Sequence, residues 1–171
     1  MIFRYIFQDS LAWNFISGAE KIKHFFSIPG YRAVVLYRMA RYFHLKKWFI
    51  FSKLLHNINY IVSNVEISLE AEIGEGFRIA HPSGVVIGKM RCGNGLTVFS
   101  GVVIGARRIG EGKEGKYAVM GDNIIIYSGA KIIGDIKVGD SVIIAANSVV
   151  LESVPDNKTV AGIPAKVIHH Q

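Results

Sequence analysis

An apolar residue recurs at every sixth position in the second half of the chain, and this repeat constrains the fold more than any other feature. A period of six matches neither an α-helix nor a single alternating strand. It predicts a solenoid in which six residues form one short flat side, three sides form one coil, and each coil covers the next. The repeated positions are Met120, Ile126, Ile132, Val138, Ile144 and Val150, with a second set at Ile124, Ala130, Ile136, Val142, Ser148 and Val154.

The same repeat begins earlier and is interrupted twice. Ile67, Ile73 and Ile79 lie six residues apart, the register then slips by one residue, and it resumes through Val86, Cys92, Val98 and Ile104. The segment 106–117, with three glycines and six charged residues, breaks the repeat and is expected to form a loop that projects from the solenoid. Residues 155–168 leave the repeat and are expected to close the last coil. The sequence therefore predicts a mainly β domain over residues 63–168.

Residues 1–62 differ from the rest in composition and in charge. They hold nine Lys or Arg residues and two acidic ones, a net charge of +7, whereas residues 63–171 hold eleven of each sign. Apolar positions at helical spacing predict helices over about 31–43 and 46–62. We expect a small α-helical cap over residues 1–62 that covers one end of the solenoid.

Two interpretations of the basic, aromatic cap remain open. Its apolar face can pack on the solenoid while its basic face is solvated, or it can make peripheral contact with the anionic inner surface of a membrane. Nucleic acid is not expected as a partner, because no nucleic-acid motif accompanies the charge. A single cysteine, no recognisable signal peptide and no apolar run of about 18 residues favour a cytoplasmic protein.

The candidate catalytic residue is His81, which lies where the register of the repeat slips. Such a slip can turn a side chain outward, as a bulge does in a sheet, and Pro82, Ser83 and Gly84 favour a turn there. Glu66 lies fifteen residues earlier, close to one coil, so it is expected on the neighbouring coil. A carboxylate that accepts the Nδ1 hydrogen of His81 would leave Nε2 as a base. A surface histidine and a solvated glutamate are the alternative interpretation.

Other reactive residues are weaker candidates. Cys92 occupies a repeat position and is expected to fill the core rather than to act as a nucleophile. No cluster of Cys and His has zinc spacing and no Walker loop is present, so no metal is expected.

Several segments together resemble the serine acetyltransferase branch of the hexapeptide-repeat acyltransferases. They are the repeat itself, AHPSGVVIG, NVEISLEAEIGEGFRI and the closing VPDNKTVAGIPAKVI. The resemblance implies a left-handed parallel β-helix, homotrimers with active sites between subunits, and acetyl-CoA as co-substrate. It assigns His81 as the general base, with Glu66 where the family has Asp. It also places the CoA groove near Ala106, Arg107, Ser128, Ala146 and Lys166.

The chain departs from that branch at positions that contact serine in it. Ala80 precedes His81 where the family has Asp. The Arg-His pair of the long loop corresponds to about Gly115 and Lys116, and an Asp-Pro pair corresponds to residues 14–16. These departures favour a sugar hydroxyl of a capsular or lipopolysaccharide pathway as the acceptor, as in short polysaccharide O-acetyltransferases that the chain most resembles. L-Serine is the alternative, with Lys116 as the contact to its carboxylate.

Overall fold

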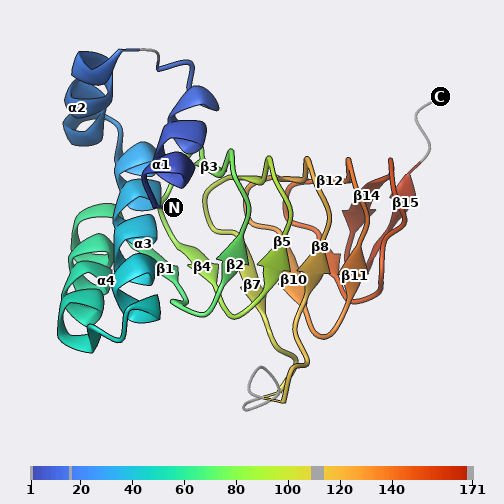
Figure 1. The fold of residues 1–171 in the computed structure, drawn as a ribbon. Helices are drawn as coiled ribbons and strands as arrows, with labels where there is room; N and C mark the ends of the chain where they lie inside the picture. The colour runs from blue at the N-terminus through green and yellow to red at the C-terminus, as the bar shows by residue number, and fades with distance from the viewer. Residues whose placement is uncertain (1, 16, 109–113, 169–171) are drawn as a thin grey trace.

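A computed structural model describes residues 2–15, 17–108 and 114–168. Four helices come first and a solenoid of short, mostly parallel strands follows (Figure 1). Three sheets form the sides of the solenoid, as the six-residue repeat predicts, and the repeat fits a left-handed β-helix. The helices are α1 (Ile2–Leu11), α2 (Gly18–Ser27), α3 (Pro29–Leu45) and α4 (Phe49–Ser63).

Each of the first four coils contributes one strand to each of the three sheets, and the last coil contributes β13 and β14 and reaches sheet B only through the isolated bridge of Val154 to Val138. Sheet A contains β1 (Val65–Ile67), β4 (Val85–Ile87), β7 (Val103–Gly105), β10 (Lys131–Ile133) and β13 (Val149–Val150). Sheet B contains β2 (Glu72–Ile73), β5 (Arg91–Cys92), β8 (Val119–Met120) and β11 (Lys137–Val138). Sheet C contains β3 (Arg78–Ile79), β6 (Thr97–Val98), β9 (Ile125–Ile126), β12 (Ile143–Ile144), β14 (Thr159–Gly162) and β15 (Ala165–Ile168). β14 and β15 form an antiparallel hairpin at the C-terminal end of the solenoid.

The repeated apolar residues form the core of the solenoid. Every predicted position from Met120 to Val154 is buried, including the one hydroxyl, Ser148, which is fully buried. Its Oγ accepts a hydrogen bond from the backbone N–H of Gly162, in the closing hairpin (3.2 Å). The polar member of the repeat is therefore satisfied where the last coil is covered.

The register slip arises at two neighbouring corners of the solenoid. The prediction that Val86 is a core residue is wrong. Val85 and Ile87 point inward, and Val86 is only half-buried between them. Val85 follows Ile79 by six positions, whereas the matching inward residues of later coils are four positions apart, so this corner holds two extra residues. The next corner, between Ile87 and Met90, is one residue shorter than its counterparts. The two extra residues at one corner and the one missing residue at the next together shift the six-residue repeat by one position.

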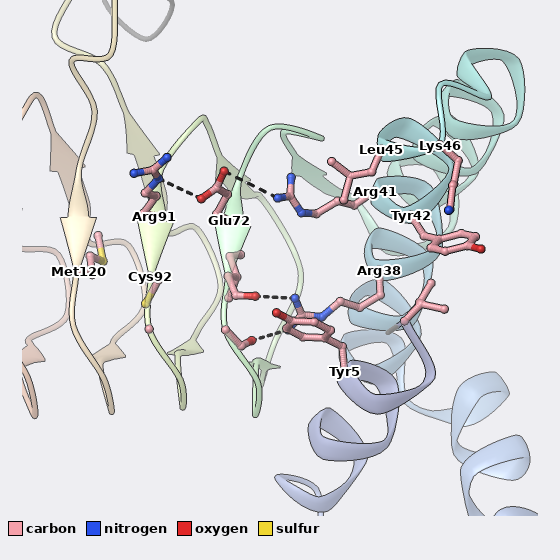
Figure 2. Close-up of a pocket in the computed structure, with 14 residues that line it drawn as sticks. Tyr5, Arg38, Arg41, Tyr42, Leu45, Lys46, Glu72, Arg91, Cys92 and Met120 are labelled. Carbon is pink, nitrogen blue, oxygen red and sulfur yellow. Dashed lines mark hydrogen bonds and ion pairs between the residues drawn. The ribbon is translucent and has the colours of Figure 1, made fainter.

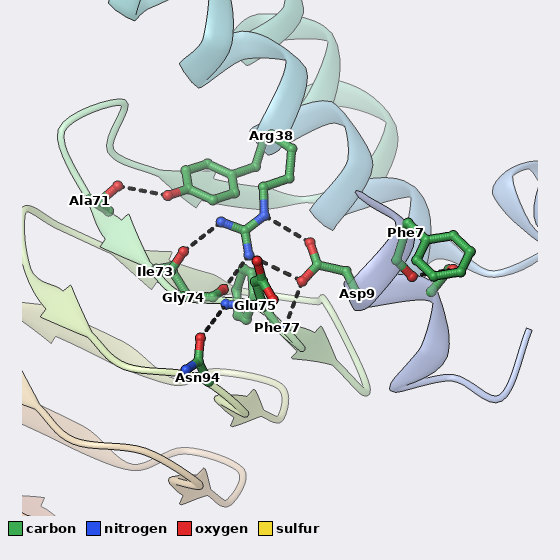
Figure 3. A network of polar contacts seen from close by, with 11 residues as sticks. Phe7, Asp9, Arg38, Ala71, Ile73, Gly74, Glu75, Phe77 and Asn94 are labelled. Carbon is green, nitrogen blue, oxygen red and sulfur yellow. Dashed lines mark hydrogen bonds and ion pairs between the residues drawn. The ribbon is translucent and has the colours of Figure 1, made fainter. Parts of the chain in front are cut away.

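A buried ion pair fixes the helices to the first coil. Arg38 of α3 donates from Nε to Asp9 Oδ2 of α1 (2.8 Å) and from Nη1 to the carbonyl of Ile73 (2.6 Å) (Figure 3). Asp9 Oδ1 also accepts the backbone N–H of Phe77 (2.9 Å). Beside it, the hydroxyl of Tyr37 donates to the carbonyl of Ala71 (2.7 Å), and burial raises the pKa of Tyr37 to about 12. Both helices are thus bound to backbone groups of the solenoid.

The flanks of the predicted loop, 106–108 and 114–117, contain neither helix nor strand. In Figure 1 they leave the solenoid between β7 and β8. Residues 109–113 of this loop lie outside the described part of the chain. Among the helices that the structure describes, none is both long and apolar enough to span a membrane.

Candidate active site

His81 lies at the corner where the chain passes from sheet C to sheet A. Its side chain is exposed, and the corner follows β3 and precedes β4. The two extra residues of this coil fall here, which is why His81 leaves the apolar core. The predicted outward placement of His81 is therefore what the structure has, while its catalytic role stays a prediction.

Two aromatic residues continue this corner on the next coils. The rings of His81 and Phe99 have centroids 6.0 Å apart, and Phe99 stacks on Tyr127 at 5.0 Å. Neither residue is among the site residues predicted from the sequence. The six-residue repeat would allow both to be predicted, because Phe99 and Tyr127 each come directly after an inward residue, as Ala80 comes after Ile79. The ring of Phe99 gives the imidazole of His81 a flat apolar neighbour.

Ser128 and Ala146 lie at the same corner, further along the solenoid. The backbone N–H of Asn147 donates to the carbonyl of Ser128 (2.9 Å), so the two turns stack directly. The hydroxyl of Ser128 accepts a hydrogen bond from Ser100 Oγ (3.3 Å). Both predicted CoA positions therefore have short side chains in line with His81.

Glu66 lies on the outer surface of sheet A, next to the corner of His81. It pairs in register with Val86, and Gly84 of the corner donates from its N–H to the carbonyl of Asn64 (3.1 Å). The predicted placement on the neighbouring coil is correct. No hydrogen bond joins Glu66 to His81 among the described residues, so the predicted orienting contact stays a prediction.

Ala106 and Arg107 lie at the opposite edge of sheet A, whereas Lys166 lies on β15 of sheet C and reaches the turn after β13 with its ammonium group. Ala106 and Arg107 follow β7, and Arg107 Nη2 donates to the carbonyl of Leu151 (3.3 Å). Lys166 of β15 pairs with Glu152 (Nζ to Oε2, 3.4 Å). Two cations from distant segments thus meet one turn, Leu151–Glu152. The sequence predicted both residues but not that they converge.

Lys116 lies in the loop between β7 and β8, at that same edge. Its Nζ pairs with Glu114 Oε2 (2.9 Å), and its side chain is half exposed. Within one chain, Lys116 and His81 occupy different corners of the solenoid. The residue matched to a serine contact is thus not brought to His81 by the fold of a single chain. Of the other stretch matched to serine, Asn14 and Phe15 lie between α1 and α2, and residue 16 lies outside the described residues.

A separate cavity of about 870 Å³ lies between the helices and sheet B (Figure 2). At its rim Glu72 pairs with Arg91 Nε (2.9 Å) and with Arg41 Nη2 (4.0 Å). Its thiol, Cys92, is buried, and burial raises the pKa of Cys92 to about 12. None of the candidate catalytic, CoA-binding or acceptor-binding residues lines this cavity. The sequence did not predict it, because it forms between two parts of the chain.

Comparison with known proteins identifies the family. The model for bacterial transferase hexapeptide (six repeats) matches residues 117–152. A serine acetyltransferase of Helicobacter pylori is 36% identical over 141 residues, which cover 82% of this chain and 81% of that protein. One of Synechococcus elongatus is 35% identical over 169 residues, covering 98% of this chain but only 66% of that protein.

Solved structures give the same result. Neisseria gonorrhoeae serine acetyltransferase in complex with serine has a TM-score of 0.84 and 27% identity, covering 98% of this chain and 69% of that one. A serine acetyltransferase in complex with CoA has a TM-score of 0.74 and 31% identity, covering 82% of this chain and 57% of that one. The predicted resemblance and the predicted class, an acyltransferase, are confirmed. The chain belongs to the serine acetyltransferase family of hexapeptide-repeat transferases.

Proposed function

We propose that this protein transfers the acetyl group of acetyl-CoA directly to an acceptor hydroxyl. The observation that carries the proposal is the exposed His81 on a two-residue insertion at a corner of a solenoid of this family. Inward residues of the repeat are apolar and unreactive, so a histidine placed outside the core at this irregular corner is available for proton transfer.

The reaction needs one base and no acyl-enzyme. Nε2 of His81 removes the proton of the acceptor hydroxyl while that oxygen attacks the thioester carbonyl. The tetrahedral intermediate then expels the CoA thiolate, which takes the proton back from His81. The products are an acetyl ester and free CoA. Backbone N–H groups at the corner would stabilise the oxyanion.

Glu66 is proposed to orient His81. A carboxylate that accepts the Nδ1 hydrogen fixes the tautomer in which Nε2 is the base. Its place on sheet A, beside the strand that follows the His81 corner, supports this role.

The co-substrate fits the distribution of charge and side-chain size. Ser128 and Ala146 leave room along the corner for the pantetheine arm. Arg107 and Lys166 suit the phosphates of CoA because their charged groups contact two consecutive residues, the carbonyl of Leu151 and the carboxylate of Glu152. The relative solved with CoA supports this choice of co-substrate.

L-Serine is the proposed acceptor. The relatives compared above are named serine acetyltransferases, and one was solved with serine. The sugar acceptor favoured by the sequence has no support from these relatives, whose names favour the alternative instead. One observation keeps a sugar hydroxyl as the second candidate. Ala80, half-buried beside His81, offers no carboxylate to the amino group of serine.

We also propose a homotrimer with active sites between subunits. His81 and Lys116 lie at different corners of one solenoid, so a neighbouring copy is needed to bring the loop to the base. The charge of Lys116 could then meet the carboxylate of serine.

The acceptor is tested by measuring CoA release from acetyl-CoA with L-serine and, in parallel, with a panel of free and nucleotide-linked sugars. Saturable turnover with L-serine, and none above background with sugars, is the expected result. Faster turnover with a sugar would reject L-serine as the acceptor. No turnover with any hydroxyl compound, together with no acetyl-CoA binding by calorimetry, would reject acetyl transfer itself.

A further inference from the structure

The buried residues of helix α4 are polar, whereas most of its large apolar side chains are exposed. Its buried residues are Ser52, Asn59 and Ser63. Ser52 Oγ donates to the carbonyl of Ala40 (2.9 Å), and Asn59 Nδ2 donates to the carbonyl of Ala33 (3.0 Å), both on α3. Small polar contacts to α3 therefore help to hold α4 in place, together with the ring contacts of Phe51 with Phe43 and of Phe49 with His44 at the start of the helix.

Those apolar side chains form a continuous outer face. Ile50, Leu54, Ile58 and Ile61 follow one another at helical spacing, and Ile50 and Ile61 are 82% and 78% exposed. Figure 1 places α4 at the outermost end of the molecule, with α3 between it and the solenoid. Trp48, Phe49, Phe51 and Val62 extend the exposed apolar area. An apolar area of this extent on a surface helix marks an interaction surface.

The charge around this face has one sign. Residues 21–65 contain eight Lys or Arg residues and no Asp or Glu. Lys46, Lys47 and Lys53 are exposed beside the outer face, and in the described part of the chain none of them has an ion pair. A partner that covers the apolar face must also accept these uncompensated positive charges.

We propose that the outer face of α4 (Ile50, Leu54, Ile58 and Ile61) binds the surface of an anionic lipid membrane. Apolar side chains enter the boundary between headgroups and acyl chains while the lysines contact anionic headgroups. A second copy of the chain fits less well, because pairing two α4 faces would oppose lysine to lysine without an acidic residue from either helix. This inference does not depend on acetyl transfer.

The test is cosedimentation of the full chain with vesicles of two compositions. One is pure phosphatidylcholine and the other is equal parts phosphatidylcholine and phosphatidylglycerol. The protein is expected to bind only the second, and binding is expected to weaken as salt is added. The triple variant Ile50→Ser, Leu54→Ser, Ile61→Ser should lower the partition coefficient by about a hundredfold or more. Replacing Lys46, Lys47 and Lys53 by Gln should lower it about fivefold per lysine at low salt.

The matched control is Ile163→Ser, which removes an isoleucine of similar exposure (74%) in the closing hairpin at the other end of the solenoid. It should bind vesicles like the unaltered chain. If the triple variant melts at a lower temperature, vesicle binding is compared instead for the single variant Ile50→Ser and for the lysine variants. Equal binding of the unaltered chain to both vesicles, or equal binding by the triple variant and Ile163→Ser, would overturn the proposal. The proposal would also be overturned if the triple variant bound vesicles as before and only the sedimenting mass of the free protein changed. That result would identify the outer face of α4 as a contact between copies of the chain.

Discussion

Cys92 occupies an inward position of the repeat, and this position decides its chemistry. The residue is 8% exposed, its thiol donates to the carbonyl of Gly121 (3.5 Å), and burial raises its pKa to about 12. Thiolate is the reactive form, and raising a thiol pKa from its ordinary value to about 12 leaves it almost entirely protonated at pH 8. The interpretation of Cys92 as core filler rather than nucleophile is consistent with its surroundings.

We predict that iodoacetamide at pH 8 alkylates Cys92 in the folded protein at least about a hundredfold more slowly than in urea. Mass spectrometry of the alkylated chain measures both rates. Cys92→Ala should also retain acetyl transfer. Rapid labelling of the folded protein, or loss of transfer in Cys92→Ala, would contradict this account of the residue.

At the scale of elements, the ion pair between Arg38 and Asp9 connects α3 with α1. Both side chains are buried, at 5% and 0% exposure, and desolvation raises the pKa of Asp9 above its ordinary value. Removal of one partner leaves a buried charge without compensation. Asp9→Ala should therefore lower the free energy of unfolding by about 3–5 kcal/mol, measured by urea denaturation.

The comparison for that prediction is Arg4→Ala. Arg4 pairs with Glu75 (2.6 Å), but its side chain is 74% exposed, so its loss should cost about 1 kcal/mol or less. Equal losses in the two variants would show that burial does not set the contribution of the ion pair.

The sequence predicts elements best where one periodicity dominates. The inward residues of the unbroken repeat from Met120 to Val154 follow from spacing alone, because a six-residue side leaves no alternative register. The prediction that Val86 points into the core is wrong because a two-residue insertion and a one-residue deletion lie close together, and in the sequence they look like a single slip of one residue. The aromatic stack beside His81 and the convergence of Arg107 and Lys166 depend on contacts between coils. Spacing within one coil does not reveal such contacts.

At the scale of the whole molecule, the proposed active site needs more than one chain. His81 and Lys116 lie at separate corners, and the outer surface of sheet A lies between those corners. We predict that sedimentation equilibrium gives a mass three times that of the 18.9 kDa chain. An active monomer would contradict the proposal that neighbouring copies complete the site.

The most direct test of the account is the activity of His81→Ala, since the proposed reaction has one base. CoA release from acetyl-CoA would be measured with L-serine, or with the best acceptor of the panel. The account predicts a loss of about 10²–10⁴-fold in kcat with the fold retained. His56→Ala, which removes a histidine of helix α4 outside the solenoid, should remain within about twofold of the unaltered protein. A His81→Ala variant that keeps near-normal transfer would contradict the assignment of the base.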